Sequence, residues 1–312
     1  MRWSTCLLLL VLTTFASPHF AAAQAPAKPA ESKGETKTLL TKDGWALEIS
    51  YFDSPLEKDA PVVVLLHGKD ENRVVWDPLA TELKKLGFAA ISVDLRKAKN
   101  GKSKPPVKGN PQSKSDTVTK SDYEAMIGLD LEAVKKFIYE EHQAKKLNMR
   151  RMAIVGADVS TVIALNYAAL DWAKLPHDDN PVLANKTPKG QDVRAVVLLS
   201  PAEAVIGVSV NQQLPFLRAT DVSVLMLHPN SGAEKAGAEK IFQQLGGEKQ
   251  QKEDPRFERF GFETKQKGTQ LLQQPVQIGN VTGRGYQLVI GFLDKRVKKP
   301  DIEWHDRKSK LE

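Results

Sequence analysis

The stretch Gly156-Ala157-Asp158-Val159-Ser160 decides the fold of this chain. It follows a continuously apolar run, Met152–Val155, and opens a segment of small residues whose apolar side chains recur at helical spacing. A strand that turns sharply into a helix is typical of this pattern, and the middle residue of such a turn projects its side chain from the apex. That residue is an aspartate, so we expect a carboxyl group at the apex of a strand-to-helix turn.

Strands and helices alternate on both sides of this turn. Pro61–Leu66 is continuously apolar and β-branched, which predicts a strand buried on both faces of a parallel sheet. Asp77 is expected to cap a helix that has Pro78 at its first position and ends at Gly87. Strict alternation predicts the α/β class: a mostly parallel, twisted sheet of about eight strands with helices on both faces. The other predicted strands span residues 38–41, 46–51, 89–93, 152–155, 193–199, 222–227 and 257–264, and the other predicted helices span 123–143, 162–170, 233–245 and 286–297.

The first residues carry the pattern of an export signal. Arg2 precedes an apolar stretch centred on Leu7–Leu12, and Ala21–Ala23 offers small residues for cleavage. This pattern predicts a signal peptide over residues 1–23, and therefore a secreted or periplasmic protein. The only cysteine, Cys6, lies inside the predicted signal, so we expect no disulfide and no thiolate chemistry in the mature chain.

The rest of the chain divides into a short tether and one domain. Residues 24–37 are rich in Ala, Pro, Lys and Glu, which predicts a flexible tether. We expect a single domain over residues 38–312, because we find neither an internal repeat nor a second composition regime. No stretch after the signal is apolar enough to span a membrane.

One segment concentrates positive charge. Residues 96–120 contain eight Lys and Arg side chains against one acid, Asp116, and several Pro and Gly residues predict a loop. Two interpretations remain open: a solvated insertion, or an electrostatic contact with an anionic polymer or surface. The segment lacks interleaved aromatic residues, which argues against nucleic acid as the partner.

The order of these elements, together with the residues at their turns, resembles the α/β-hydrolase family over residues 38–297. Leu65–Gly68 is similar to the family's oxyanion-side turn, and Ser92–Arg96 to the end of its fourth strand. Gly156–Ser160 stands at the family's nucleophile elbow, and Leu198–Pro201 is similar to the end of its sixth strand. The short connection that follows Pro201 resembles the compact esterase and peptidase-like branch, which has no large lid. From the resemblance we expect His67, Gly68, Lys69 and Val159 to form the oxyanion-side binding turn and elbow.

The family's serine, histidine and acid are all replaced or missing. Asp158 stands at the serine position, and Lys267 stands at the histidine position of a turn, Lys267–Leu272, that resembles the family's H-G-T-x-L-L. Gly283–Gly285 is a competing alignment of this turn and also lacks histidine. No carboxylate follows the seventh strand directly, and Glu203 is a candidate replacement for the acid. Since a protonated lysine accepts no proton, we expect no group at this centre to take up protons near neutral pH.

The aspartate admits two interpretations. Related haloalkane dehalogenases and epoxide hydrolases use an aspartate at this position to form an alkyl ester, which implies a nucleophile. Alternatively, Asp158 is present because aspartate tolerates a positive φ, and the following helix N-terminus favours an anion. Ser160 is a second candidate nucleophile. We also predict an ion pair between Asp158 and Lys267, because each charge would otherwise be buried alone.

These observations favour a catalytically degenerate hydrolase that acts by binding an unknown small molecule or anionic polymer. The alternative is an active hydrolase of ester, amide or alkyl bonds that uses Asp158 or Ser160. The histidines His142, His177 and His305 have no metal-ligand spacing, and His228 is expected in a turn. We therefore expect neither a metal nor a cofactor.

Overall fold

The computed structural model describes residues 34–106, 117–248 and 255–311 of the 312-residue chain. The predicted signal peptide, residues 1–23, and most of the predicted tether lie outside the described residues. In the described part, no helix is both long enough and apolar enough to cross a membrane.

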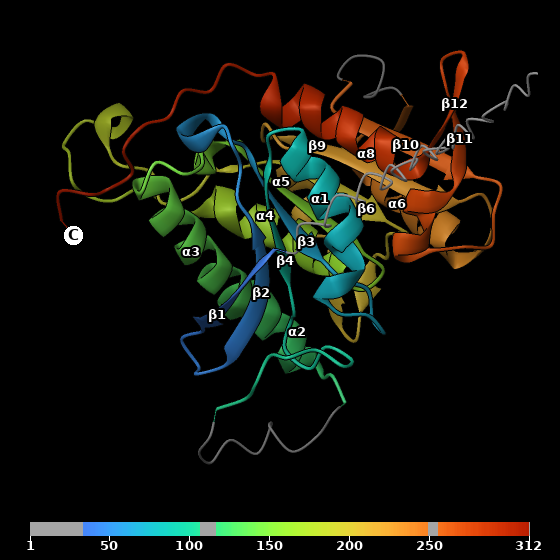
Figure 1. Ribbon diagram of the computed structural model, residues 1–312, viewed down its shortest axis with the longest axis horizontal. Helices are drawn as coiled ribbons and strands as arrows, with labels where there is room; N and C mark the ends of the chain where they lie inside the picture. Colours follow the sequence, from blue (N-terminus) through green and yellow to red (C-terminus); the bar gives the residue numbers. More distant parts are fainter. Residues whose placement is uncertain (1–33, 107–116, 249–254, 312) are drawn as a thin grey trace, which may run out of the picture. The chain divides into compact units, whose positions relative to one another are not determined.

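The eight predicted strands are all present and form one sheet (Figure 1). The strands are β1 (Glu35–Leu40), β2 (Ala46–Phe52), β3 (Val62–Leu66), β4 (Ala89–Val93), β5 (Met152–Ala157), β6 (Val193–Leu199), β9 (Ser223–Pro229) and β10 (Phe257–Phe262). Their order is β1-β2-β4-β3-β5-β6-β9-β10, with β1 and β2 at one edge and β10 at the other. β2 runs antiparallel to β1 and to β4, and all other neighbours are parallel. The predicted mostly parallel sheet is therefore confirmed.

Helices pack on both faces of this sheet, and each face has its own apolar core. The helices are α1 (Asp77–Lys85), α2 (Lys120–Ala125), α3 (Leu131–Gln143), α4 (Ser160–Ala173), α5 (Gln213–Arg218), α6 (Gly232–Gln244) and α8 (Gly285–Leu293). Side chains of α1 and α8 pack against one face, and those of α3, α4 and α6 against the other. The predicted cap is wrong at one position, because Asp77 is the first residue of α1 rather than its cap.

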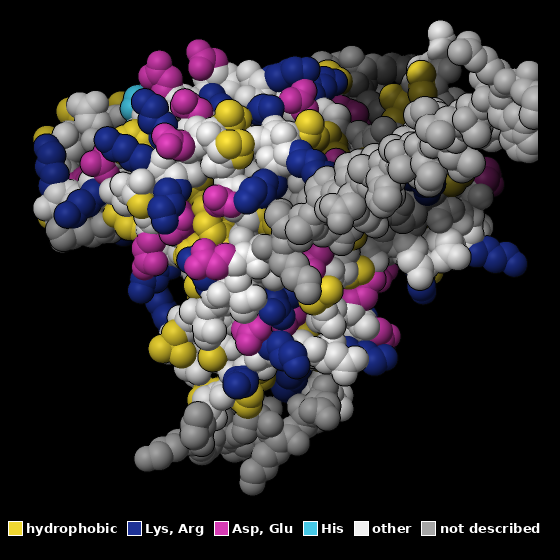
Figure 2. All heavy atoms as spheres, viewed as in Figure 1, with side chains coloured by type: hydrophobic (Ala, Val, Ile, Leu, Met, Phe, Trp, Pro, Cys, Tyr) yellow, Lys and Arg dark blue, Asp and Glu magenta, His cyan; other side chains and the backbone are white. Residues whose placement is uncertain are grey.

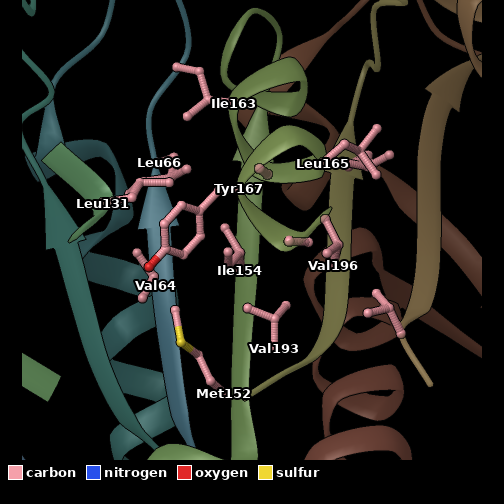
Figure 3. Packing of buried hydrophobic residues seen from close by; sticks show 14 of the residues in the cluster. Val64, Leu66, Leu131, Met152, Ile154, Ile163, Leu165, Tyr167, Val193 and Val196 are labelled. Atoms are coloured by element: carbon pink, nitrogen blue, oxygen red, sulfur yellow. The ribbon is translucent and has the colours of Figure 1, made fainter. Parts of the chain in front are cut away.

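Tyr167 of α4 lies at the centre of the larger core (Figure 3). Its ring lies among Val64, Leu66 and Ile154, whose side chains project from two neighbouring parallel strands. Since these strands are buried on both faces, their residues are continuously apolar, as predicted from Pro61–Leu66. This packing fixes α4, and with it the turn that precedes α4.

Several features of the fold were not predicted. A π-helical turn, Met126–Asp130, divides the predicted helix 123–143 into α2 and α3. Two short hairpins are added, β7–β8 (Ala204–Val205 and Val208–Ser209) and β11–β12 (Pro275–Ile278 and Val281–Arg284). Between β6 and β9 the chain forms only the first hairpin and α5, which agrees with the expected absence of a large lid.

The first two residues of the basic segment 96–120 are not solvated. The Arg96 guanidinium is 1% exposed and forms ion pairs with Asp130 and Asp43. Lys97 pairs with Asp122 at 2.8 Å, and its side chain is also buried. Each buried cation therefore has a carboxylate partner that lies far away in the sequence. Over the face in Figure 2, basic and acidic side chains are interspersed.

Asp130 is the buried partner of Arg96, and its replacement tests this ion pair. We expect Asp130→Ala to lower the free energy of unfolding by about 3 kcal/mol, because Arg96 then keeps only its half-buried partner, Asp43. Urea unfolding measures this loss. The control is Glu82→Ala, which removes an exposed pair with Lys85 and is expected to cost less than about 0.5 kcal/mol. Equal losses in both variants would contradict the importance of the buried pair.

Candidate functional site

The predicted strand-to-helix turn is present between β5 and α4. Asp158 forms its apex with a φ of 49°, a conformation that aspartate adopts more readily than most residues. Gly156 permits the turn, because a methyl group at this position would lie 2.8 Å from the carbonyl oxygen of Ser160. The Asp158 N–H donates to the Leu199 carbonyl at 2.9 Å. The turn is thus tied to the end of the neighbouring strand β6.

Ser160, the second candidate nucleophile, is the first residue of α4. Its side chain is fully buried. Its hydroxyl lies 2.9 Å from the carbonyl oxygens of Leu66 and Ala157, and it accepts a hydrogen bond from the Ala157 N–H. These contacts join the elbow to the end of β3. The hydroxyl therefore has a structural role and is closed to a substrate.

Two glycines face the Asp158 carboxyl group from opposite turns. A methyl group on Gly68 would stand 2.6 Å from Asp158 Oδ2, and one on Gly268 would stand 2.7 Å from the same atom. Lys267–Leu272 is therefore the turn that adjoins the elbow. The competing alignment is wrong, because Gly283–Gly285 lies at the end of β12 and the start of α8. A side chain at either position would crowd this carboxyl group, and the φ of 56° at Gly268 disfavours other residues there as well.

Lys267 does not form the predicted ion pair with Asp158. Its ammonium group lies 3.3 Å from Glu234, at the start of α6, and its side chain is 63% exposed. In the described part, no ion pair or hydrogen bond involves the Asp158 side chain. The physical reason is desolvation: an exposed pair with Glu234 spares the lysine the cost of burial. Lys267 acts on Asp158 only through a longer-range attraction.

Glu71 is the site residue that sequence reasoning missed. Its carboxylate accepts hydrogen bonds from the Gly68 N–H at 2.8 Å and from the Thr269 hydroxyl. It therefore links the oxyanion-side turn to the turn that follows β10. Its oxygen Oε2 would also lie 2.9 Å from a methyl group on Gly68, so it adjoins Asp158. The available signal was the acidic pair Asp70-Glu71, directly after the predicted oxyanion-side turn.

The environment of Asp158 favours its protonated form. Burial and the negative charge of Glu71 raise the pKa of Asp158 to about 6, and the attraction of Lys267 opposes this shift only in part. The expectation that no group here takes up protons near neutral pH is therefore wrong. The group that titrates is the aspartate itself.

No imidazole is bonded to this carboxyl group in the described part. His67 is buried: its Nδ1 lies 2.8 Å from the Gly68 carbonyl oxygen, and its Nε2 accepts from the Leu95 N–H. Burial also lowers the pKa of His67, so a neutral ring holds the turn. His228 lies in β9 rather than in a turn, with Nδ1 2.8 Å from the Pro229 carbonyl oxygen. Glu203, the candidate acid, pairs with Lys240 at 2.9 Å.

Two backbone N–H groups beside Asp158 are without a hydrogen bond in the described part, one in the turn after β3 and one in the elbow. Gly68 uses its N–H on Glu71, whereas the N–H groups of Lys69 and Val159 make no hydrogen bond within the described part. These are two of the positions expected to form the oxyanion-side turn and elbow. In the described ranges, no cluster of three His, Cys, Asp or Glu side chains is arranged to hold a metal ion.

A cavity of about 690 Å³ adjoins the elbow. The turn 67–70, the loop after β4, α2, the first turn of α4 and the β7–β8 hairpin enclose it. Lys69, Asp70 and Lys99 line it with charged groups. Its apolar wall includes Trp45, Leu95, Tyr123, Met126, Ile163 and Ile206.

The fold and this site place the chain among known structures. No family model matches the chain, and no curated protein matches it in sequence. The structure is similar to an esterase from Pyrococcus furiosus over 85% of this chain and 92% of that chain, with a TM-score of 0.57 and 14% identity. It is also similar to DcsB, solved with a substrate analogue, over 85% and 99% of the two chains, with a TM-score of 0.54 and 12% identity.

At such identities the likeness concerns the fold. The mostly parallel sheet, its flanking helices and the elbow between β5 and α4 define a protein with the α/β-hydrolase fold. The chemistry of the site must then be derived from this chain's own residues.

The raised pKa of Asp158 predicts how its replacement changes stability with pH. The folded chain binds this proton more tightly than the unfolded chain, so ionisation costs folding free energy as the pH rises from about 4 through about 6. Asp158→Asn removes that cost. We expect the variant to match the wild type at pH 4 and to be about 2 kcal/mol more stable at pH 8.

Chemical denaturation at a series of pH values measures this difference. The matched control is Asp301→Asn, which changes an exposed carboxyl group far from the elbow in sequence and is expected to change stability little. A stability gain for Asp158→Asn that is the same at pH 4 and pH 8 would contradict the raised pKa.

Proposed function

We propose that this chain is a secreted α/β-hydrolase-fold protein that has lost the serine-hydrolase reaction and acts by binding a small molecule in the cavity beside the elbow. The observation that carries the proposal is which group lies beside the Asp158 carboxyl group. The carboxylate of Glu71 adjoins the apex residue, and no imidazole is bonded to it in the described part.

The reaction of this fold requires a group that removes a proton from the nucleophile or from water. Lys267 is poorly placed to supply it, because its ammonium group lies 3.3 Å from Glu234 and makes no ion pair with Asp158. Asp158 and Glu71 repel each other when both are ionised, and this favours proton retention at Asp158. The cavity and the open N–H groups of Lys69 and Val159 are features that suit binding without turnover.

Secretion is proposed on the sequence alone. Residues 1–23 have the charged start, apolar centre and small-residue cleavage region of a signal peptide, and residues 24–312 contain no cysteine.

A second candidate function is an active hydrolase that uses Asp158 as its nucleophile. One observation favours it: the Asp158 side chain makes no hydrogen bond or ion pair in the described part, so its carboxylate is free to attack. Attack on an alkyl carbon would release a halide or open an epoxide and leave an alkyl ester. Water would then have to cleave the ester, and Glu71 is the neighbouring group that could orient this water.

An activity panel separates the two candidates. We expect nitrophenyl esters, haloalkanes and epoxides to react no faster with the wild type than with Asp158→Ala, because no base completes the site. Any residual ester hydrolysis should stay within roughly 10³–10⁴ of the rate in water, as for hydrolases stripped of their triad. Steady-state kinetics with both proteins measure this.

Trapping an intermediate makes the test sharper. If Asp158 were the nucleophile, Glu71→Gln would accumulate the ester, and mass spectrometry would find the alkyl group on the peptide that contains Asp158. That adduct, or turnover abolished by Asp158→Ala, would replace the first proposal by the second.

A further inference from the structure

Ile206 has a backbone conformation that its side chain disfavours. It has a φ of 42° and Gly207 has a φ of 78°, and these two residues form the loop of the β7–β8 hairpin. Two positive φ values in a two-residue hairpin loop define a type I′ turn, for which Asn-Gly is the preferred pair. A β-branched residue at positive φ is a genuine outlier. The turn is therefore strained at Ile206.

The flanking strands hold Ile206 in this position. Val205 and Val208 are paired across the hairpin, and both side chains are buried in the core. The Gly207 backbone packs near the Lys120 side chain at the start of α2, since a methyl group on this glycine would lie 3.4 Å from Lys120 Cδ. Ile206 itself is 56% exposed, so its side chain gains little from burial. Folding alone gives no reason for isoleucine here.

The position of Ile206 in the cavity wall gives a reason. It lines the cavity together with Tyr123, Met126 and Ile163, from α2, the π-helical turn and α4. The buried cations of this wall are already neutralised, Arg96 by Asp130 and Asp43 and Lys97 by Asp122. Lys69, Asp70 and Lys99 also line the cavity, whereas the hairpin contributes the apolar side chain of Ile206 to its wall.

We infer that Ile206 is a ligand contact, and that the cavity takes a small molecule with an apolar alkyl or aryl body. Binding buries the exposed side chain, and the strained turn holds the isoleucine in the cavity wall. This inference rests on the proposed binding function and adds the chemical class of the ligand.

Ile206→Asn tests the inference with two readouts of opposite sign. Asparagine relaxes the I′ turn, so we expect the melting temperature of the free protein to rise by roughly 2–4 °C. Loss of the apolar contact is expected to weaken binding about tenfold. The probe is N-phenyl-1-naphthylamine, an uncharged apolar dye whose fluorescence increases when it is bound.

Two matched variants separate strain from contact. Glu57→Asn changes another residue with positive φ, 50°, which lies outside the cavity wall, and is expected to leave dye affinity unchanged. Val281→Asn removes a 68% exposed apolar side chain from the β11–β12 hairpin. Its dye affinity is expected to equal that of the wild type.

The outcomes distinguish this inference from the proposed function. Saturable dye binding that Ile206→Asn weakens, while raising the melting temperature, supports the inference. If Ile206→Asn binds the dye with the same affinity as the wild type, Ile206 is not a ligand contact, but the proposed binding function still holds. Absence of saturable binding by the wild type contradicts both.

Discussion

The close approach of three backbone segments to one carboxyl group governs this site. Asp158 adopts a positive φ at the end of β5, and Gly68 and Gly268 each bring their backbone within van der Waals contact of its side chain. The approach requires the ends of β3 and β5 to be held in register, which the Ser160 hydroxyl achieves by bonding to the Leu66 carbonyl. This geometry partly buries the Asp158 carboxyl group, and burial disfavours its ionised form. The same geometry that positions a nucleophile in this fold here raises the proton affinity of an aspartate.

Electrostatics around this carboxyl group differ in sign from those of a working hydrolase. In a serine hydrolase the group beside the nucleophile becomes positive as it takes up a proton. Here the neighbour is Glu71, fixed by the Gly68 N–H and the Thr269 hydroxyl, and its negative charge opposes ionisation of Asp158. Lys267 would be the natural counter-ion, but Glu234 pairs with it at 3.3 Å. The result is a pair of neighbouring carboxyl groups, with no base bonded to Asp158 in the described part of the chain.

The fold was predictable because it depends on patterns along the chain. Continuous apolar strands such as Val62–Leu66, alternating with helices, specify a parallel sheet without knowledge of any partner. The partner of a charged side chain is a different matter. In the sequence, Arg96 is the first residue of a basic loop. In the structure it is buried and forms ion pairs with Asp130, in a π-helical turn, and with Asp43, in a hairpin. Glu71 was missed for the same reason: its hydrogen bonds reach Thr269, almost two hundred residues away. The spacing of apolar residues identifies the buried face of a helix or strand. It does not identify which distant side chain contacts that face.

Backbone strain is concentrated at the carboxyl edge of the sheet. The described part contains eight non-glycine residues with positive φ, and three of them, Lys97, Asn100 and Ile206, line the cavity. Two more adjoin the elbow: Asp158 forms it, and Ser200 accepts the Gly268 N–H that holds the next turn in place. Strain persists only where the surrounding structure over-determines it, and functional sites are where it collects. Among these residues, Ile206 is the β-branched one, in a turn whose geometry favours asparagine. The strain collected at this edge supports the proposed binding site beside the elbow.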